Sequence, residues 1–432
     1  MIRYRLLADG PPDAVFARRA GQAITVRTFL NDAATLAATL PAMRHVANLC
    51  CDRYRFTVGL AAALTRGQIS LLPPNDTPEL LAELAADYQD LHCLTDEMVA
   101  PSASLGPIEV PDFPASQPAV VLFTSGSTGR PQPHPRNWGT LVRSARAAGK
   151  RLGIAAYPGA ALLGTVPHQH SYGLESLVML ALQYRLVMHT ERLFYPEDIR
   201  TELALSPSPR LLVTTPIHLR VLLSEPTELP PADLVLSATA PLSPQLARQA
   251  EARFTAPLFE IYGCSEAGQL AARRTTKTAE WRCLDGIKLT QDETGTRAAG
   301  VPVASTLPLN DVLELRSETR FILHGRLADL VNVAGKRTSL AHLTHHLNAI
   351  EGVQDGIFVA LDPKTEDTVT RLAAFAVAPT LTADAILGAL RKRIDAAFLP
   401  RPLHLVEELP RNALGKLPQA ALPQLLAQAA GS

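Results

Sequence analysis

The chain carries no excess of charge of either sign. Lysine and arginine together number 41, and so do aspartate and glutamate. Proteins that bind nucleic acid or lie on membrane surfaces usually have a basic excess, which attracts phosphate groups. The sequence therefore predicts a protein without a nucleic-acid partner, although the balance leaves room for a small local basic patch.

Cysteine is scarce, and long apolar runs are absent. Five cysteines in 432 residues are too few for a disulfide scaffold, and none belongs to a C-x-x-C pair of the kind that binds zinc or carries redox chemistry. The N-terminal stretch MIRYRLLADGPPDAVF lacks the apolar core of a signal peptide. No run reaches the roughly 18 apolar residues that a membrane-spanning helix requires. We expect a cytoplasmic protein that does not insert into membranes.

The pattern of apolar residues predicts alternating strands and helices. A chain of 432 residues with 47% hydrophobic residues is long enough for two or three globular domains. Four short runs are typical of buried strands, namely 161–167, 210–216, 233–240 and 257–263. Thr77-Pro78 and Ser243-Pro244 each offer a capping side chain followed by a proline in the first helical turn. This alternation predicts an α/β fold with layered, largely parallel sheets.

The character of the sequence changes after residue 324. Strand-like runs cover 356–361, 371–379 and 403–410, and an amphipathic helix is predicted over 382–395. We expect a large N-terminal domain of residues 1–324 and a small α+β C-terminal domain of residues 325–432.

A loop rich in small hydroxylated residues follows a strand-like run. In LFTSGSTGRPQPHPRNW (122–138), the apolar run ends in TSGSTG (124–129). Successive N–H groups of such a loop can cradle phosphate oxygens. The loop fits neither GxxxxGK[ST] nor GxGxxG. The alternative interpretation is an ordinary surface turn.

Three further segments carry candidate chemistry. IYGCSEAG (261–268) follows a predicted strand, and Glu266 could hold Mg²⁺, which prefers oxygen ligands; an exposed acidic turn is the alternative. FILHGRLADLVNVAGKR (321–337) lies at the predicted domain joint and could equally be a charged linker. LPRNALGKLPQ (409–419) holds Lys416, which in isolation would be a solvated charge.

Together, in this order, the segments resemble the adenylate-forming superfamily of acyl-CoA synthetases, aryl-acid ligases and adenylation domains. TSGSTGRP resembles its phosphate loop, YGCSE its Y-G-x-[ST]-E segment, GRLAD its G-R-x-x-D segment, and PRNALGK its P-R-x-x-x-G-K segment. DRYRFTVGLAAALTRGQISLLPPN (52–75) is most similar to the compact aryl-acid:acyl-carrier-protein ligases of xanthomonadin and aryl-polyene pigment pathways.

The resemblance implies a reaction in two halves. A carboxylate, expected to be of the hydroxybenzoate type, attacks the α-phosphate of ATP in the presence of Mg²⁺. The thiol of CoA, or of the phosphopantetheine of an acyl carrier protein, then takes the acyl group and releases AMP. The C-terminal domain is expected to be mobile, because it carries the catalytic lysine to the first of these steps.

The resemblance also assigns roles to individual residues. Lys416, Glu266 and His170 are expected to be catalytic, with Glu266 as the Mg²⁺ ligand and His170 beside the acyl pocket. Ser265 is expected near the α-phosphate, Tyr262 at adenine, Asp311 at the ribose hydroxyls, and Arg326 at ribose or phosphate. Gly263 is expected to be a nucleotide-binding residue. Ala238 and Thr239 are expected in the adenine and acid pocket. The β- and γ-phosphates are assigned to Thr124, Ser125, Gly126, Ser127, Thr128 and Gly129.

The chain departs from the family pattern in places. Gln132 and Pro133 stand near the position of a family lysine, so a phosphate-side charge is missing or is supplied by Arg130. Ala328 occupies the hinge position, and Asn332 falls where many members have lysine. The changes at Gln132 and Ala328 leave open a non-catalytic nucleotide- or acyl-adenylate-binding protein. An acyl-CoA synthetase for aliphatic acids is a separate alternative.

Histidines offer weaker signals. His168 and His170 have H-x-H metal-ligand spacing, but no third ligand is evident, so a metal there is not the favoured interpretation. A second set, on a predicted helix, is expected to be solvated: His342, His345 and His346.

Overall fold

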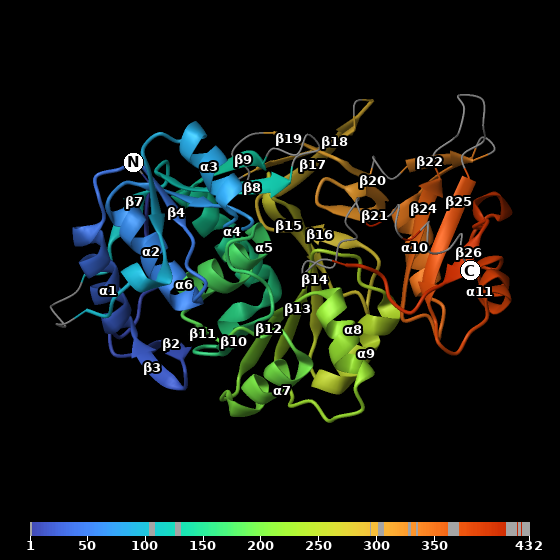
Figure 1. Cartoon of the computed structure of the whole chain (residues 1–432), viewed down its shortest axis with the longest axis horizontal. Coiled ribbons are helices and arrows are strands. Elements are labelled where there is room, and N and C mark those ends of the chain that lie inside the picture. Colours follow the sequence, from blue (N-terminus) through green and yellow to red (C-terminus); the bar gives the residue numbers. More distant parts are fainter. Residues whose placement is uncertain are drawn as a thin grey trace.

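The computed structural model describes residues 2–102, 109–125, 131–293, 295–300, 306–326, 330–333, 336–361, 371–411, 421 and 425. Figure 1 shows the chain laid out along its long axis, with the N-terminal elements at one end and the C-terminal sheet at the other. Loop residues 126–130 and the segment around Lys416 lie outside the described residues.

An eleven-stranded sheet forms the centre of the molecule, in the order β20-β21-β16-β15-β14-β13-β12-β10-β11-β2-β3. Its strands are β2 (Val15–Arg19), β3 (Gln22–Thr25), β10 (Ala161–Gly164), β11 (Val187–His189), β12 (Arg210–Thr214), β13 (Leu234–Ser237), β14 (Leu258–Cys264), β15 (Gly268–Arg273), β16 (Trp281–Cys283), β20 (Asp311–Ser317) and β21 (Arg320–Arg326). The pairings from β14 through β2 are parallel, and those at both ends are antiparallel. The four strands predicted from apolar runs are β10, β12, β13 and β14 of the parallel part, where strands are buried on both faces.

A second sheet has five strands in the order β6-β4-β5-β8-β9. They are β4 (His45–Asn48), β5 (Ile69–Leu72), β6 (Leu91–Leu94), β8 (Pro118–Ser125) and β9 (Pro131–Asn137). Only β9 pairs antiparallel, and it forms one edge of the sheet. An edge strand tolerates Pro133 and Pro135, because proline has no N–H to donate to a ladder.

Helices and small sheets complete the N-terminal part. They are α1 (Val26–Thr39), α2 (Arg53–Thr65), α3 (Pro78–Asp87), α4 (Trp138–Leu152), α5 (Ser171–Gly173), α6 (Leu180–Tyr184), α7 (Pro196–Leu205), α8 (Pro216–Ser224), α9 (Pro244–Phe254), β1 (Arg3–Arg5), β7 (Asp112–Pro114), β17 (Ile287–Asp292), β18 (Gly295–Gly300) and β19 (Leu307–Leu309). One apolar cluster joins both large sheets through α1, α2 and α4, with Phe29, Phe56 and Leu141 among its members. Among the described residues, no helix has both the length and the apolar character to cross a bilayer.

The predicted helix starts are confirmed at their first residues. Helix α9 begins at Pro244, and the Ser243 side chain accepts a hydrogen bond from the Leu246 N–H at 3.2 Å. Helix α3 begins at Pro78, although Thr77 makes no side-chain cap. Helix α2 is buried on nearly every face. Its sequence therefore has no amphipathic pattern from which the helix could be predicted.

The smaller C-terminal part has its own core. It contains β22 (Leu330–Val333), β23 (Lys336–Ser339), α10 (Leu340–Asn348), β24 (Asp355–Leu361), β25 (Arg371–Val377), α11 (Ala383–Leu390) and β26 (Leu403–Leu405). Leu343, Phe358 and Ile386 belong to an apolar cluster formed entirely by residues beyond 330. The predicted α/β fold with a large first and a small second domain is confirmed. Strand β21 runs through Gly325 to Arg326, and we therefore propose that the join lies after Arg326.

One local prediction was wrong. His342, His345 and His346 are half-buried on α10 rather than fully solvated, because α10 packs against β24 and β21. Burial lowers the pKa of each of the three imidazoles.

Candidate active site

Two sheet edges meet where the predicted site residues lie. The carboxyl ends of parallel strands share one edge of a sheet, and ligands of α/β proteins bind there. Ala238 and Thr239 follow β13 at that edge, and Ser265 and Glu266 follow β14. Arg136, on β9 of the other sheet, donates a hydrogen bond from Nη2 to the Ser265 carbonyl at 2.7 Å. The phosphate-loop hairpin β8–β9 therefore lies against the turn that carries Glu266.

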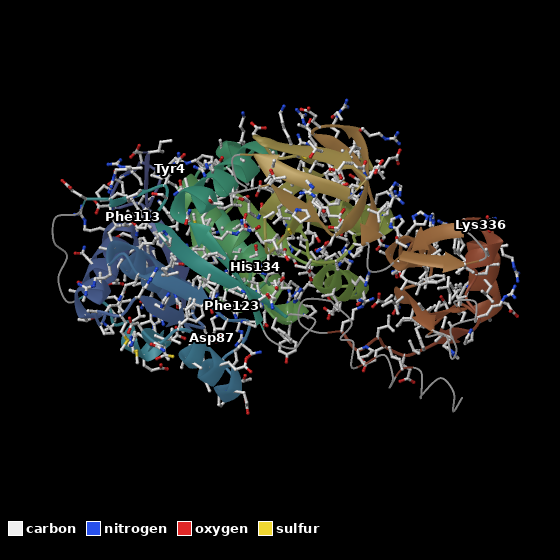
Figure 2. The ribbon with its side chains drawn as sticks, turned by 90° about the horizontal axis from the view of Figure 1, so that it is seen from above. Tyr4, Asp87, Phe113, Phe123, His134 and Lys336 are labelled. Atoms are coloured by element: carbon white, nitrogen blue, oxygen red, sulfur yellow. The ribbon has the colours of Figure 1, made fainter. Side chains whose placement is uncertain are left out.

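A threonine, a histidine and a glutamate come together at this junction. Thr124 Oγ1 lies 2.9 Å from His134 Nε2. Burial lowers the pKa of His134, and the nearby Glu266 carboxylate opposes that shift. Glu266 itself is exposed. In Figure 2, His134 lies near Phe123 in the N-terminal part, and Lys336 marks the opposite, C-terminal end.

His134 and Arg136 are functional candidates that the sequence reading missed. In PQPHPRN (131–137), Gln132, His134 and Arg136 alternate with prolines. Alternation on a strand places these three polar residues on one face, a signal that the sequence did contain. Arg136 is 5% exposed, and its Nε has no partner among the described residues.

Two of the predicted nucleotide-binding residues are hydrogen-bonded to each other. The Tyr262 hydroxyl donates to Asp311 Oδ2 at 2.7 Å. The Tyr262 ring packs against Trp281 and Phe321, with centroids 5.7 and 5.4 Å away. Asp311 pairs in strand register with Arg326, so the backbones of both predicted ribose residues lie together. Asp311, which was assigned by resemblance alone, thus lies beside Tyr262.

Gly263 stands where no side chain fits. A Cβ at this position would lie 2.2 Å from the Gly268 carbonyl oxygen, across the β14–β15 hairpin. The close backbone approach explains the glycine in the Y-G-C-S-E segment.

The segment after β13 is conformationally strained. Thr239 has a φ of 79°, in the region that side chains other than glycine rarely adopt. Such a residue costs about 1–3 kcal/mol and persists only where surrounding contacts impose it, often in a ligand site. Ala238, just before it, is buried.

The two histidines of PHQHSYG have different environments. His168 is buried, donates from Nε2 to the Cys50 carbonyl at 2.9 Å, and packs on Phe56. Burial, with Arg53 nearby, lowers its pKa to about 3. His170 is half-buried at the start of α5, and the buried Tyr172 hydroxyl near it has no partner among the described residues. No group of three potential metal ligands forms within the described part of the chain.

Glu175 is a buried carboxylate beneath the Glu266 turn, and the sequence reading missed it. It lies on a π-helical stretch, Leu174–Met179, and is 2% exposed. Its Oε2 accepts from Ser144 Oγ at 2.5 Å and from the Gln269 N–H at 3.2 Å. A Cβ at Gly268 would lie 2.4 Å from Oε1. Glu175 therefore fixes the start of β15, immediately after the turn.

Part of the predicted site lies outside the described residues. Gly126, Ser127, Thr128, Gly129 and Lys416 are in this group, as are Arg130 and Ala328. For Ser125 and Arg326 the structure describes only the strands in which they lie.

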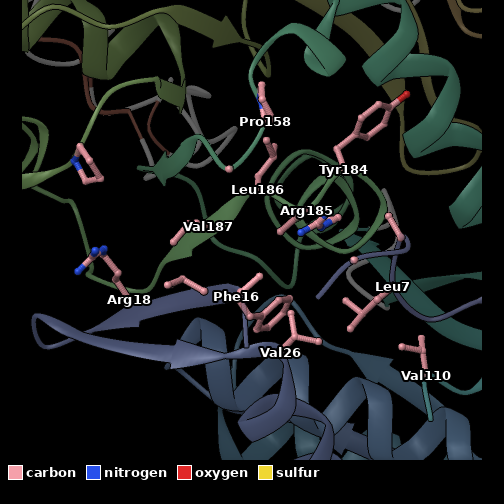
Figure 3. Close-up of a pocket in the computed structure, with 17 residues that line it drawn as sticks. Leu7, Phe16, Arg18, Val26, Val110, Pro158, Tyr184, Arg185, Leu186 and Val187 are labelled. Carbon is pink, nitrogen blue, oxygen red and sulfur yellow. The ribbon is translucent and has the colours of Figure 1, made fainter. Parts of the chain in front are cut away.

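A separate cavity lies away from this site. It has a volume of about 430 Å³ and is lined mostly by apolar side chains, including Phe16, Val187 and Leu186 (Figure 3). Pro158 and Gly159 precede β10, so the cavity lies at the opposite edge of the sheet from Glu266.

The fold and site define an adenylate-forming enzyme, and relatives support this. The sequence model described as AMP-binding enzyme matches residues 33–308. A 4-coumarate–CoA ligase of Rhodobacter capsulatus is 30% identical over 306 residues, covering 70% of this chain and 75% of that protein. A 3,4-dihydroxybenzoate–[aryl-carrier protein] ligase of Bacillus anthracis is 22% identical, covering 82% of this chain and 84% of that protein. The crystal structure of ATP-bound MatB from Rhodopseudomonas palustris superposes with a TM-score of 0.82 at 19% identity, covering 97% of this chain and 96% of that one.

The chain belongs to the AMP-binding enzyme family. It is an AMP-forming acid–thiol ligase, the class to which both of these sequence relatives belong.

Proposed function

We propose that this ligase activates an aryl carboxylic acid with ATP and Mg²⁺ and passes the acyl group to a phosphopantetheine thiol. The supporting observation is the contact between the two sheets, where Arg136 of β9 donates to the Ser265 carbonyl next to Glu266, and His134 of the same strand contacts Thr124. The phosphate-loop hairpin and the acidic turn, distant in sequence, are there in contact.

The adenylation step brings two anions together, so the protein must supply positive charge and hydrogen-bond donors. The acid's carboxylate oxygen attacks the α-phosphorus of ATP, and pyrophosphate leaves. Thr124, with Ser125 and the loop 126–129, would hold the β- and γ-phosphates. Ser265 would lie near the α-phosphate, and Lys416 would neutralise charge on the carboxylate and the α-phosphate as they approach.

Arg136 supplies a positive charge near the phosphates, where Gln132 stands close to the position of a family lysine. Its buried guanidinium has an unpartnered Nε and contacts the Ser265 carbonyl, next to Glu266. A fixed cation there would favour bound phosphate. This argues that the loss of the family lysine does not make the chain a non-catalytic binder.

Glu266 is suited to hold Mg²⁺. It is an exposed carboxylate at the edge where the phosphates would lie, and Mg²⁺ prefers carboxylate and phosphate oxygens. Bound Mg²⁺ would neutralise phosphate charge and favour departure of pyrophosphate. Glu175, through the Gln269 N–H, holds the turn that presents Glu266.

The nucleoside would lie at Tyr262 and Asp311. The Tyr262 ring, held by Asp311 and flanked by Trp281, offers an aromatic surface for adenine beside Gly263. The Asp311 carboxylate would accept from the ribose hydroxyls, with Arg326 contributing at ribose or phosphate. Ala238 and Thr239 would form the wall shared by adenine and acid.

The acid is proposed to be aromatic, of the hydroxybenzoate type, with His170 beside the acyl pocket. Ala238 and Ala240 are small and leave room for a flat ring. The relatives' names, 4-coumarate and 3,4-dihydroxybenzoate ligases, agree with an aryl acid.

The acceptor is proposed to be an acyl carrier protein, with CoA as the alternative. One relative is named for an aryl-carrier protein and another for CoA. A role in the synthesis of a xanthomonadin-like or aryl-polyene pigment rests on the resemblance of residues 52–75.

The test is ATP–pyrophosphate exchange with benzoates, hydroxybenzoates and fatty acids. We expect exchange with a hydroxybenzoate and its loss in Lys416→Ala, because the approaching anions are then not neutralised. Lys277→Ala is the matched control, since Lys277 is exposed on the turn that follows β15, at the opposite end of that strand from Glu266, and it should retain the wild-type rate.

Other outcomes would change the proposal. Exchange with fatty acids alone would favour an aliphatic acyl-CoA synthetase, and tight ATP binding without exchange on any acid would contradict the catalytic role. Mass spectrometry of the thioester product, offered both CoA and holo acyl carrier protein, identifies the acceptor.

A further inference from the structure

Three charged side chains form a contact between the two domains. None of the three belongs to the candidate active site. Asp355, the first residue of β24, lies between Arg220 of α8 and Arg411 of the C-terminal segment. We call these three residues the Asp355 clasp. Their side chains are only 15%, 21% and 13% exposed, respectively.

Arg411 is held by both carboxylate oxygens. Its Nε donates to Asp355 Oδ2 at 2.6 Å, and its Nη2 donates to Oδ1 at 3.0 Å. This two-point pairing fixes the direction of the guanidinium as well as its position. Arg411 is therefore a defined anchor on the surface of β24.

Arg411 lies in the segment PRNALGK, five positions before Lys416. Five extended residues span at most about 18 Å between Cα atoms. With Arg411 held on β24, only these five positions of chain separate the anchor from Lys416.

Arg220 reaches the same carboxylate from the N-terminal domain. Its Nη1 donates to Asp355 Oδ1 at 2.8 Å. Helix α8 starts at Pro216, immediately after the carboxyl end of β12, at the edge of the sheet that holds the candidate site. Figure 1 shows the C-terminal chain passing beside α8 on its way from β26.

The clasp has two cations for one anion, and its two ion pairs are not equivalent. Burial lowers the pKa of Arg220, Asp355 opposes the shift, and Arg411 adds to it. Removing the Asp355 charge leaves two sheltered guanidinium groups facing each other, whereas removing Arg220 leaves the Arg411 pair complete.

We propose that Asp355 is a positioning residue for the catalytic lysine and that Arg220 is the contact that docks the C-terminal domain in this arrangement. Asp355 and Arg411 belong to the same domain and move together, while rotation of that domain must break the Arg220 contact. The positioning role rests on the proposed function, because it requires Lys416 to serve adenylation.

The first test separates the two half-reactions in the full-length enzyme. We expect Asp355→Asn and Arg411→Gln to lower the rate of adenylation by about 100-fold, the loss that a misplaced catalytic group can cause, with the KM for ATP unchanged. Arg411→Gln should still convert synthetic acyl-adenylate to thioester, because that step does not need Lys416. A variant that is merely misfolded would lose both steps. Asp384→Asn, an exposed acid at the start of α11, is the control.

The second test measures docking without catalysis. Arg220→Gln should increase the maximum dimension of the full chain in small-angle X-ray scattering, and should change the ratio of the two half-reaction rates at least threefold. Arg248→Gln, on the exposed face of the next helix, should match the wild type in both.

Each failure is distinguishable. Wild-type adenylation rates in Asp355→Asn and Arg411→Gln would overturn the positioning role while leaving the proposed function intact. A wild type that forms no adenylate would overturn the proposed function and the positioning role together. Unchanged scattering of Arg220→Gln would overturn the docking contact in either case.

Discussion

At the scale of single residues, burial decides which polar groups are available for chemistry. His168 and His170 stand two positions apart in one segment, yet His168 is enclosed against Phe56 and the Cys50 carbonyl, and His170 is only half-buried at a helix start. From the H-x-H spacing alone, the two histidines cannot be told apart as functional candidates. Their surroundings leave His170 as the candidate for the acyl pocket.

The buried His168 predicts acid sensitivity. Its folded pKa is lowered to about 3, whereas in the unfolded chain it takes up a proton below about pH 6.5, so the unfolded state binds more protons in between. Stability should therefore fall as the pH drops through this window. Between pH 6.5 and 4.5 this group should account for about 2 kcal/mol of lost stability.

Urea unfolding followed by tryptophan fluorescence tests this prediction, because Trp138 and Trp281 both lie in the N-terminal part. His168→Gln keeps a donor for Cys50 without a titrating ring, and it should show a smaller loss of stability between the two pH values. An acid response in His168→Gln equal to that of the wild type would contradict the assignment. His404→Gln, in the C-terminal domain, is the control.

At the scale of secondary-structure elements, the site depends on the hydrogen bonds that hold the β8–β9 and β14–β15 hairpins in place. The β8–β9 hairpin is tied to the β14–β15 turn through Arg136, and the same turn is tied to the π-helical stretch through Glu175. Ser176 adds a second tie, because its Oγ accepts from Gln269 Nε2 at 2.7 Å. The turn that presents Glu266 is therefore held from two sides.

Removal of Glu175 should loosen this turn. We expect Glu175→Ala to lower the free energy of unfolding by about 2–4 kcal/mol, because the buried Ser144 hydroxyl and the Gln269 N–H lose their acceptor. The pyrophosphate-exchange rate should fall as well. Glu175→Gln, which retains one acceptor oxygen, should lose less in both measurements.

Urea unfolding and exchange assays on the same preparations provide the measurements. Glu228→Ala, an exposed acid in the loop after α8, is the control and should resemble the wild type. Equal stability of Glu175→Ala and Glu228→Ala would show that Glu175 does not hold the turn.

At the scale of the whole molecule, the described cores separate into two groups. The apolar clusters of the N-terminal part contain no residue beyond Leu323, and those around β24 and β25 begin at Val331. The clasp and the bond from Ser339 Oγ to the His324 carbonyl, at 2.5 Å, are polar contacts across the join. Separate cores with polar contacts between them are consistent with domains that can change position.

A fragment of residues 1–326 should consequently fold alone. We expect a single cooperative transition by circular dichroism and retained ATP binding by calorimetry, because β21 and the Tyr262–Asp311 pair stay within the fragment. Exchange should be absent, since Lys416 is missing. An unfolded fragment would contradict the proposed boundary after Arg326.

The sequence by itself determined the strands of the parallel sheet, the starts of α3 and α9, and the segments that meet at the site. These signals are short-range, because apolar runs, capping residues and glycine turns act within a few residues of the chain. It also led to Tyr262 and Asp311, whose hydrogen bond spans 49 positions, through family resemblance rather than through physical pattern.

Only the tertiary structure decided which contacts are made at the site and across the domain join by His134, Arg136, Glu175 and the Asp355 clasp. Arg136 and Ser265 are 129 positions apart, and Arg220 and Asp355 are 135 apart. Burial and the pairing of distant side chains arise when the sheets and domains pack together. No local pattern of apolar and polar residues encodes which distant groups will then share a hydrogen bond.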